Sequence, residues 1–354
     1  MADTFLLNGK ETPFKAGQMI LEAAKGGGIE IPTLCYLKGS TPTGACRVCC
    51  VEVKGARSLV AACSTPVSPG MEVSTDSEIV HRARKLNVEL LLSSGKHSCI
   101  ACEANGNCRL QDLAYFYKIT DLKFKEKEIS DIPPTEDENP FIIRDFSRCI
   151  LCGKCVQACN EVVVNRAISQ GYRGKNSKIV TGGDSPYNDS ECVFCGQCVQ
   201  VCPVGALTEK KAKGLGRPWE TQKIRTTCPY CGVGCQQLLH VKDGKIIKVT
   251  AVEDAQPNQG RLCVKGRFAY DFIYSEERLK TPLIREKNGE FREASWDEAL
   301  DLVANKFKEI IKKDGPDAIA GVSCARSINE DSYQMQKLFR AVIGTNNIDH
   351  CART

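Results

Sequence analysis

Cysteine is the residue type that dominates this sequence, with 22 among 354 residues. Cys228, Cys231 and Cys235 fall within eight residues, and Cys263 follows further along the chain. A [4Fe–4S] cluster takes four thiolates, and the glycines of this stretch would let a short loop bring three sulfurs to one side. A zinc ribbon is the alternative, because Cys-x2-Cys pairs also make tetrahedral zinc sites. Ribbons usually pair two such knuckles, so a triplet with a distant fourth cysteine favours iron–sulfur.

An internal repeat of cysteines lies upstream of this group. The first copy is Cys149, Cys152, Cys155 and Cys159, and the second, 43 positions later, is Cys192, Cys195, Cys198 and Cys202. The x2, x2, x3 spacing with a trailing proline is that of bacterial two-cluster ferredoxins, in which the fourth cysteine of each run serves the other cluster. We therefore expect one [4Fe–4S] cluster on Cys149, Cys152, Cys155 and Cys202, and another on Cys192, Cys195, Cys198 and Cys159.

Four further cysteines, Cys35, Cys46, Cys49 and Cys63, lie in a strand-rich N-terminal stretch. They fit a [2Fe–2S] centre, although their x10, x2, x13 spacing differs from the x4, x2 of plant ferredoxins. Cys50 adjoins one of these ligands. In an extended backbone its side chain should point away from that of Cys49, so we expect it to be a small buried residue.

Cys99, Cys102 and Cys108 form a group that supplies only three thiolates, so a fourth ligand is needed. His97 stands two residues before Cys99. A lone histidine is more often structural, but this one lies beside an incomplete ligand set. That position favours His97 as the fourth ligand of a [4Fe–4S] cluster.

Composition narrows the class of protein. No apolar run approaches the ~18 residues of a membrane span, and the N-terminus lacks the basic region of a signal peptide. We therefore expect a cytoplasmic location, where cysteine clusters hold metal more often than disulfides. The formal charge of +5 would suit a nucleic-acid binder. Five oxidised clusters would add about −9, which brings the holoprotein near about −4, so no nucleic-acid partner is expected.

The elements that must position these ligands are predicted to be short and mixed. A hairpin is expected at residues 4–7 with a turn at Asn8-Gly9, a strand at 51–53, and a second hairpin from 238–241 and 246–249. Helical patterns cover residues 18–25, 79–92 and 110–115, and Arg82, Arg84 and Lys85 are expected on a solvated helix face. Residues 121–140 are predicted to form a linker.

The C-terminal pattern is that of an α/β domain. Ser295-Trp296-Asp297-Glu298 is a capping box that should open a helix reaching about residue 313. A strand is expected at 318–322 and a helix at 329–343, ended by Gly344. A strand, a loop and a helix in this order begin an α/β domain.

Three stretches resemble known families. Residues 43–53, with Cys46 and Cys49, resemble the N-terminal [2Fe–2S] domain of the complex I iron–sulfur subunit, [FeFe]-hydrogenases and NAD-linked formate dehydrogenases. The stretch from His97 to Cys108 resembles the His(Cys)3 domain of the same families, which implies His97 as a ligand, although only Ser98 separates it from Cys99. Residues 228–267 resemble the cluster domain of molybdenum or tungsten bis-pterin-guanine-dinucleotide oxidoreductases.

The last resemblance implies where a pterin would bind. It places Lys265 between the cluster and the pterin. Residues 323–330 align with a loop that touches a pterin dinucleotide, which implies contacts from Arg326, Asn329 and Glu330, although Cys324 departs from the usual small polar residue.

The resemblance implies an α+β multi-domain iron–sulfur protein. Its expected parts are a β-grasp [2Fe–2S] domain at 1–78, a His(Cys)3 domain at 79–120, a two-cluster ferredoxin domain at 138–210, a [4Fe–4S] domain at 221–280, and the beginning of an α/β molybdopterin-binding domain at 281–354. [FeFe]-hydrogenases lack the Cys228 motif, and the complex I subunit lacks the eight-cysteine repeat.

This order of parts, with the ending at residues 346–354, is similar to that of the catalytic subunit of cytoplasmic formate dehydrogenases linked to NAD(P) or to a hydrogenase. In that family the ending precedes the selenocysteine or cysteine that binds the metal. We therefore expect the reading frame to continue through a UGA codon read as selenocysteine, with no catalytic residue before it.

The resemblance implies that formate and CO2 are interconverted at Mo- or W-bis(molybdopterin guanine dinucleotide). Electrons would leave singly through one [2Fe–2S] and four [4Fe–4S] clusters. A flavin- or NAD(P)-binding subunit, or a hydrogenase iron–sulfur subunit, would dock near residues 1–120, and ferredoxin is a further acceptor. The alternative is a non-catalytic electron-transfer subunit, like those of complex I or hydrogenases. The metal and the acceptor stay open.

Overall fold

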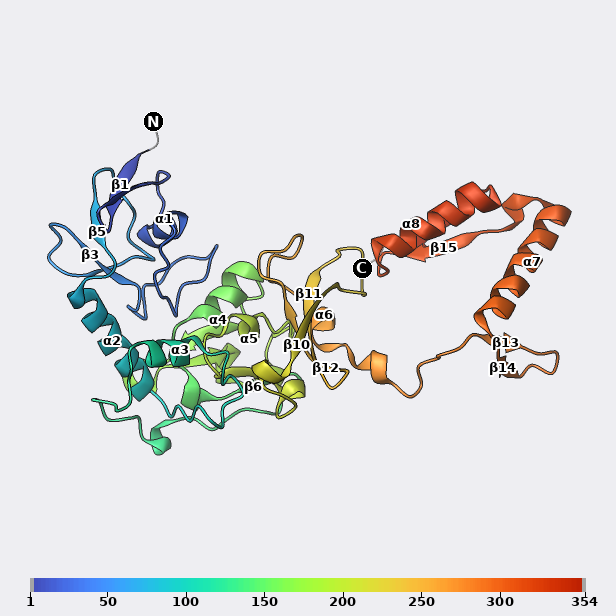
Figure 1. Ribbon diagram of the computed structural model, residues 1–354. Helices are drawn as coiled ribbons and strands as arrows, with labels where there is room; N and C mark the ends of the chain where they lie inside the picture. The colour runs from blue at the N-terminus through green and yellow to red at the C-terminus, as the bar shows by residue number, and fades with distance from the viewer. Residues whose placement is uncertain (1–2, 352–354) are drawn as a thin grey trace. The chain divides into compact units, whose positions relative to one another are not determined.

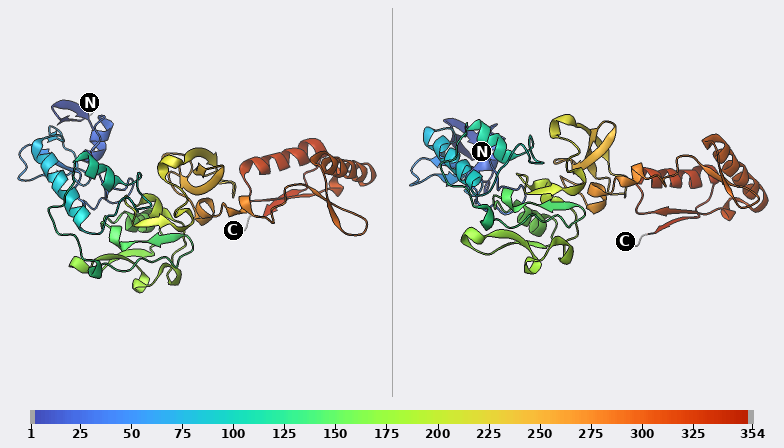
Figure 2. Two further views of the ribbon diagram at one scale, coloured as in Figure 1. Left: turned by 60° about the horizontal axis from the view of Figure 1, so that its bottom comes forward. Right: turned by 90° about the horizontal axis from the view of Figure 1, so that it is seen from below.

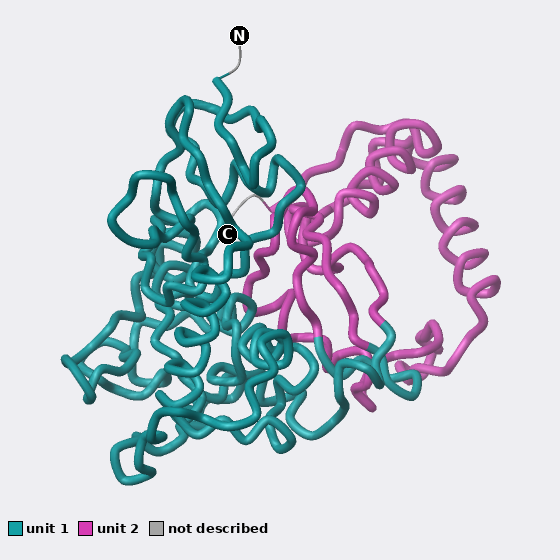
Figure 3. The backbone as a smooth tube through the Cα atoms, turned by 60° about the vertical axis from the view of Figure 1, so that its left-hand side comes forward, with its two compact units in different colours: residues 1–222, 241–248 teal, residues 223–240, 249–354 magenta. Residues whose placement is uncertain are grey.

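The computed structural model describes residues 3–351, which fall into two compact units (Figure 3). Unit 1 contains the residues up to 222 together with 241–248, and unit 2 contains 223–240 and the residues from 249 onward. The elements are short and follow one another closely along the chain (Figure 1). Among residues 3–351, none of the helices has the length and apolar character needed to cross a membrane.

The helices are α1 (Ile20–Gly26), α2 (Glu78–Ser93), α3 (Arg109–Phe116), α4 (Lys154–Gln157), α5 (Gln197–Val201), α6 (Val264–Phe268), α7 (Trp296–Asp314) and α8 (Asn329–Lys337). The strands are β1 (Thr4–Leu7), β2 (Lys10–Pro13), β3 (Cys50–Val53), β4 (Val60–Ala61), β5 (Glu72–Ser74), β6 (Ile142–Arg144), β7 (Ile168–Gly171), β8 (Lys178–Thr181), β9 (Leu207–Glu209), β10 (Gln222–Thr227), β11 (Gln236–Lys242), β12 (Lys245–Ala251), β13 (Leu283–Arg285), β14 (Phe291–Glu293), β15 (Gly321–Cys324) and β16 (Ile348–Cys351).

The N-terminal sheet has the order β2-β1-β5-β3-β4. β1 pairs antiparallel with β2 and parallel with β5, and β3 pairs antiparallel with β5. The predicted hairpin is confirmed, and its turn residues Asn8 and Gly9 both have positive φ, as a two-residue turn of this kind requires. Helix α1 buries Ile20 and Leu21 in the core of this sheet. It begins two residues later than predicted, because Met19 is extended.

Helix α2 confirms the predicted helix at residues 79–92, but the expectation of a wholly solvated charged face is wrong for Arg84. Arg84 is 4% exposed. Its Nε and Nη2 atoms donate to the carbonyl of Cys50, at 3.1 and 2.9 Å. The physical reason is that α2 packs on β3, so one arginine of the helix faces inward and satisfies a buried carbonyl. Cys50 itself is buried, as predicted.

The cysteine repeat lies in the rest of unit 1, among two antiparallel strand pairs, β6 with β9 and β7 with β8. The two copies share a backbone conformation as well as a spacing. Leu151 and Phe194 have φ of 51° and 53°, and the glycines after the second cysteines, Gly153 and Gly196, have φ of 75° and 70°. Each copy then enters a short helix, α4 or α5.

Strands β10, β11 and β12 form a sheet in that order, which includes the predicted second hairpin. The predicted N-cap is confirmed, because the Ser295 side chain accepts a hydrogen bond from the Glu298 backbone N–H at 3.1 Å at the start of α7. The Glu298 carboxylate, which would complete a capping box, pairs instead with Arg292. Helix α8 lies alongside β15 (Figure 2) and continues through a π-helical turn, Leu338–Ile343, to Gly344 at φ 87°.

The strand predicted at residues 318–322 lies later than expected. Residues Pro316–Ala318 form a 3-10 turn, and β15 begins at Gly321, where it pairs in parallel with Ile348 of β16. Pairing with β16 therefore determines where β15 begins, and the local pattern of apolar residues does not contain that information.

Substituting Arg84 by methionine should lower the free energy of unfolding by about 2 kcal/mol, because a buried carbonyl loses two hydrogen bonds from a charged donor. Arg82→Met is the matched control, since Arg82 lies on the same helix and is exposed. It should change stability by less than about 0.5 kcal/mol. Urea unfolding of the two variants under identical conditions measures both values, and equal losses would contradict a structural role for Arg84.

Candidate iron–sulfur centres

The first cysteine group is formed by two loops that meet between two apolar cores of unit 1. Cys49 and Cys63 belong to the core of the N-terminal sheet, and Cys35 and Cys46 belong to a core that also includes residues of α2 and α3. Hydrogen bonds from the thiols of Cys46 and Cys63 lower the pKa of Cys35, and a hydrogen bond from Cys63 lowers that of Cys49. The structure therefore brings all four predicted sulfurs together.

The second group consists of His97, Cys99, Cys102 and Cys108, which line one pocket together with Arg148. The Nε2 atom of His97 is buried and has no hydrogen-bond partner. The ring bonds to the backbone of Leu91, and because Nε2 has no partner this bond is made by Nδ1. Burial lowers the pKa of the ring, so the imidazole is neutral. An orphaned buried nitrogen beside three cysteines fits a metal ligand whose other nitrogen is fixed by a hydrogen bond.

The third group combines the two copies of the repeat. Cys149, Cys152 and Cys155 line a pocket with Cys202, the fourth cysteine of the second copy. Most of the remaining lining is apolar, including Phe146, Ile150, Ile179, Val204 and Leu207. Burial, and then the nearby thiol of Cys202, raise the pKa of Cys152 to about 12.

The fourth group is the reciprocal one. Burial, and then the thiols of Cys195, Cys192 and Cys159, raise the pKa of Cys198. Cys159 lies in a π-helical turn, Ala158–Val162, that extends α4. The structure therefore places Cys159 near the cysteines of the second copy and Cys202 beside those of the first.

The fifth group lies in unit 2. The loop from Cys228 to Cys235 is closed by a hydrogen bond from the Cys228 N–H to the Cys235 carbonyl at 2.8 Å. Cys263 precedes α6 as its N-cap and is exposed. Burial raises the pKa of Cys228, and the thiols of Cys235, Cys263 and Cys231 raise it further, so the four side chains lie together.

None of the 22 cysteines, all of which lie within residues 3–351, forms a disulfide. Within residues 3–351, no three His, Cys, Asp or Glu side chains lie close enough to hold a single metal ion. Each of the five groups above is defined in one of two ways. Its side chains either line a common pocket or lie close enough for one thiol to change the pKa of another.

The four predicted pterin contacts are more scattered. Lys265 in α6 and Arg326 after β15 are exposed, and Glu330 lies in the first turn of α8. Asn329 donates its side-chain N–H to the Gly232 carbonyl at 2.7 Å, which ties the start of α8 to the loop of the fifth group.

A hollow of about 310 Å³ lies nearby in unit 2. It is lined by Ser323, Cys324, Ala325, Ser332, Gln336, Arg340, Ile348, Asp349 and His350. Its lining thus comes from β15, α8 and β16 and does not include the four predicted pterin contacts.

Family comparisons agree with this series of centres. Residues 3–78 match the 2Fe-2S iron-sulfur cluster binding domain, 84–123 the NADH-ubiquinone oxidoreductase-G iron-sulfur binding region, and 148–206 the 4Fe-4S dicluster domain. Residues 221–275 match the molybdopterin oxidoreductase Fe4S4 domain, and 278–354 match molybdopterin oxidoreductase. The C-terminal part of the chain thus matches molybdopterin oxidoreductase domains, and residues 84–123 match an NADH-G-like iron–sulfur region. The predicted multi-domain iron–sulfur fold class is confirmed.

Two curated relatives align with 98% of the chain. The alpha subunit of an NADPH-Fe(3+) oxidoreductase of Geobacter sulfurreducens is 40% identical over 347 residues. A Staphylococcus aureus protein whose name assigns it provisionally as a formate dehydrogenase is 36% identical over 388 residues. The chain spans only 40% and 39% of the lengths of these relatives.

A solved structure resembles part of the chain. A chain in the crystal structure of an NAD+-reducing [NiFe]-hydrogenase in the H2-reduced state is 35% identical, with a TM-score of 0.57. The match covers 62% of the present chain and 91% of that chain.

Two residues that border the second group had no signal in the sequence. Val204 lines both the pocket of His97 and that of Cys149. An added Cβ at Gly205 would lie 2.3 Å from the Cys102 Sγ and 3.3 Å from the Ala104 Cβ. The position of Gly205 three residues after Cys202 was available in the sequence, but its contact with Cys102 depends on tertiary packing.

Gly205→Ala should therefore disturb the second group selectively, because the new methyl group would overlap the Cys102 sulfur. We expect loss of about four of the roughly 18 iron atoms that one [2Fe–2S] and four [4Fe–4S] clusters contain. Gly182→Ala is the control, since an added Cβ there meets open space. Iron analysis and electron paramagnetic resonance (EPR) of both purified variants make the comparison. A Gly205→Ala protein with full iron and a native spectrum would show that the close contact is unimportant.

Proposed function

We propose that this chain is the electron-transfer portion of a formate dehydrogenase catalytic subunit, which passes single electrons between a Mo- or W-bis(molybdopterin guanine dinucleotide) and a partner subunit. The observation that supports this most strongly is the joining of five ligand groups to a molybdopterin oxidoreductase region in one chain. A relative aligned with nearly the whole chain bears a provisional formate dehydrogenase name.

The proposed clusters are one [2Fe–2S] and four [4Fe–4S]. Their proposed ligands are, in chain order, Cys35, Cys46, Cys49 and Cys63; His97, Cys99, Cys102 and Cys108; Cys149, Cys152, Cys155 and Cys202; Cys192, Cys195, Cys198 and Cys159; and Cys228, Cys231, Cys235 and Cys263. The buried, unpartnered Nε2 of His97 and the shared pocket of Cys202 with the first copy of the repeat support these sets.

The metal–pterin group, when bound, would supply the two-electron chemistry of formate and CO2. The residues of this chain would hold and insulate the centres that carry the electrons away. Apolar side chains exclude water around the sulfurs, and backbone N–H groups bond to them, as Phe194 does to Cys192 Sγ at 3.4 Å. Burial and such hydrogen bonds set cluster potentials. Lys265, Arg326, Asn329 and Glu330 are the proposed pterin contacts.

We further propose that the partner docks near residues 1–120 in the cytoplasm, because the [2Fe–2S] ligand group lies in that segment. A flavin- or NAD(P)-binding subunit or a hydrogenase iron–sulfur subunit fits this role, with ferredoxin as a further acceptor. The likeness of 62% of the chain to a chain of an NAD+-reducing hydrogenase supports a subunit of a larger oxidoreductase complex.

The same likeness favours a second candidate function. In this alternative the chain is an electron-transfer component without an active site of its own. The relative named as an NADPH-Fe(3+) oxidoreductase subunit, 40% identical, shows that similar chains carry names unconnected with formate.

The native polypeptide purified from its source organism separates the two candidates. About one Mo or W per polypeptide, a guanine-dinucleotide pterin, and EPR signals of reduced clusters after addition of formate alone are expected for the formate dehydrogenase. Clusters that stay oxidised with formate but become reduced with NAD(P)H or with H2 and a partner hydrogenase would favour the alternative. About 18 iron atoms are expected in either case.

His97→Ala should remove the cluster of the second group, with loss of about four iron atoms, because three thiolates are an incomplete ligand set. His97→Cys should retain the iron and lower the midpoint potential of that cluster, since a thiolate adds negative charge where the imidazole was neutral. His81→Ala is the control, because His81 bonds to Asp76 at 2.6 Å outside every ligand group. Iron content and a potentiometric EPR titration report both effects, and full iron in His97→Ala would rule out this ligand assignment.

A further inference from the structure

Arg148 occupies a place between two of the ligand groups in unit 1. Its backbone immediately precedes Cys149, which lines the pocket of the third group. Its side chain lines the other pocket, that of His97, Cys99, Cys102 and Cys108. Arg148 therefore lies between the second and third ligand groups, and Val204 lines the pockets of both.

The guanidinium of Arg148 is held in one orientation. Its Nε atom pairs with Asp145 Oδ2 at 2.7 Å, and its Nη1 atom donates to the Ser98 carbonyl at 3.2 Å. Asp145 is itself fixed, because its Oδ1 atom accepts from the Ser147 backbone N–H at 2.9 Å. The side chain of Arg148 is only 17% exposed. A planar guanidinium with two anchored nitrogens has a defined direction for its remaining N–H groups.

The side chain of Arg148 also lies close to Cys102, which lines the same pocket. A Cβ added at Gly205 would lie 2.3 Å from the Cys102 sulfur and 3.4 Å from the Arg148 Cδ, so both side chains contact the same small residue. Burial lowers the pKa of Arg148, but Asp145 and the nearby thiol of Cys102 raise it, so the guanidinium lies within reach of that sulfur. Arg217 also approaches this loop, but it donates to the carbonyls of Cys102 and Ile100 and not to a sulfur.

We propose that Arg148 is a positioning residue that raises the reduction potential of the centre at His97, Cys99, Cys102 and Cys108, by donating an N–H to the Cys102 sulfur and placing a fixed positive charge beside it. The inference rests on the proposed ligand set. A hydrogen bond to a ligand sulfur and a nearby cation both stabilise the reduced cluster, which carries one more negative charge.

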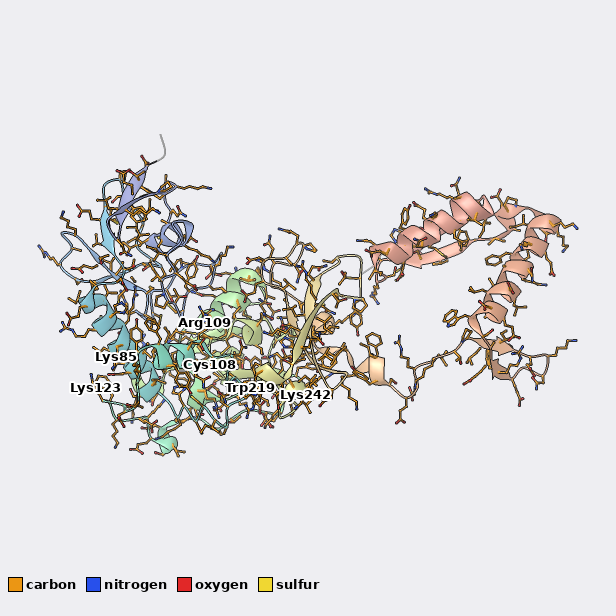
Figure 4. The ribbon with its side chains drawn as sticks, in the orientation of Figure 1. Lys85, Cys108, Arg109, Lys123, Trp219 and Lys242 are labelled. Carbon is orange, nitrogen blue, oxygen red and sulfur yellow. The ribbon has the colours of Figure 1, made fainter. Side chains whose placement is uncertain are left out.

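The test compares Arg148→Gln with Arg109→Gln. Arg109 follows the ligand Cys108 as Arg148 precedes the ligand Cys149, but its side chain is 62% exposed and faces Glu30 at 3.7 Å (Figure 4 labels Cys108 and Arg109). At a fixed solution potential, Arg148→Gln should lower the ratio of reduced to oxidised His97 centre at least tenfold, about 59 mV for one electron. Arg109→Gln should change it less than twofold, and Arg148→Lys, which keeps the charge, should recover part of the loss.

The readout is a potentiometric EPR titration of the full chain with its clusters, in which the signal of this centre is identified by its shift in His97→Cys. An unchanged potential in Arg148→Gln would overturn the proposal while leaving the ligand assignment intact. A chain in which His97→Ala alters neither iron nor spectrum would overturn the ligand assignment, and the proposal with it.

A second measurement uses the native chain and tests the role of Arg148 even if the Arg148→Gln variant loses the cluster. In the native chain grown with arginine labelled with nitrogen-15 in its guanidinium, electron spin echo modulation of the reduced His97 centre should show a coupling to that nitrogen. The absence of this coupling would show that no arginine bonds to a sulfur of the cluster and would overturn the proposal.

Discussion

The structure depends on one constraint: the ligand sulfurs must be taken out of water and still be able to ionise. Burial raises the pKa of Cys108 and Cys149 to about 11, so these groups are neutral thiols in the protein alone. Only a bound metal centre compensates a group of adjacent thiolates in so apolar a setting. The same constraint applies to His97, whose side chain is neutral. Its Nε2 atom is buried without a hydrogen-bond partner, and leaving such an acceptor unsatisfied costs free energy unless it binds a ligand.

A shared apolar core fixes the spacing of three groups in unit 1. Cys35 and Cys46, Cys108, and Cys149 with its partners all pack against the same set of buried side chains, which includes Val88 of α2, Leu110 of α3 and Val204. Because interiors are close-packed, a change in one site is transmitted to its neighbours. The rigid core therefore determines how far an electron must travel between these sites.

In unit 2 the side chain of Asn329 connects the loop of the fifth cysteine group to the start of α8. Asn329 bonds to Gly232 at 2.7 Å, and an added Cβ on Gly232 would lie 2.7 Å from the Asn329 Oδ1. The residue that resemblance assigned to the pterin thus also holds the cluster loop. In the proposed function Asn329 would contact both the pterin and the cluster loop, which suits a site in which electrons leave a cofactor through an adjacent cluster.

The sequence by itself predicted which cysteines would group together, because the spacing of cysteines along a short loop limits which sulfurs can meet. Spacing also predicted that Cys159 and Cys202 would each lie with the other copy of the repeat, and periodicity and capping predicted helices α2 and α7. Only the tertiary structure decided that Arg84 is buried, that Gly205 contacts Cys102, and that Arg148 lies beside Cys102. These features join segments that are far apart in the chain, and side-chain packing between such segments leaves no local pattern to predict them.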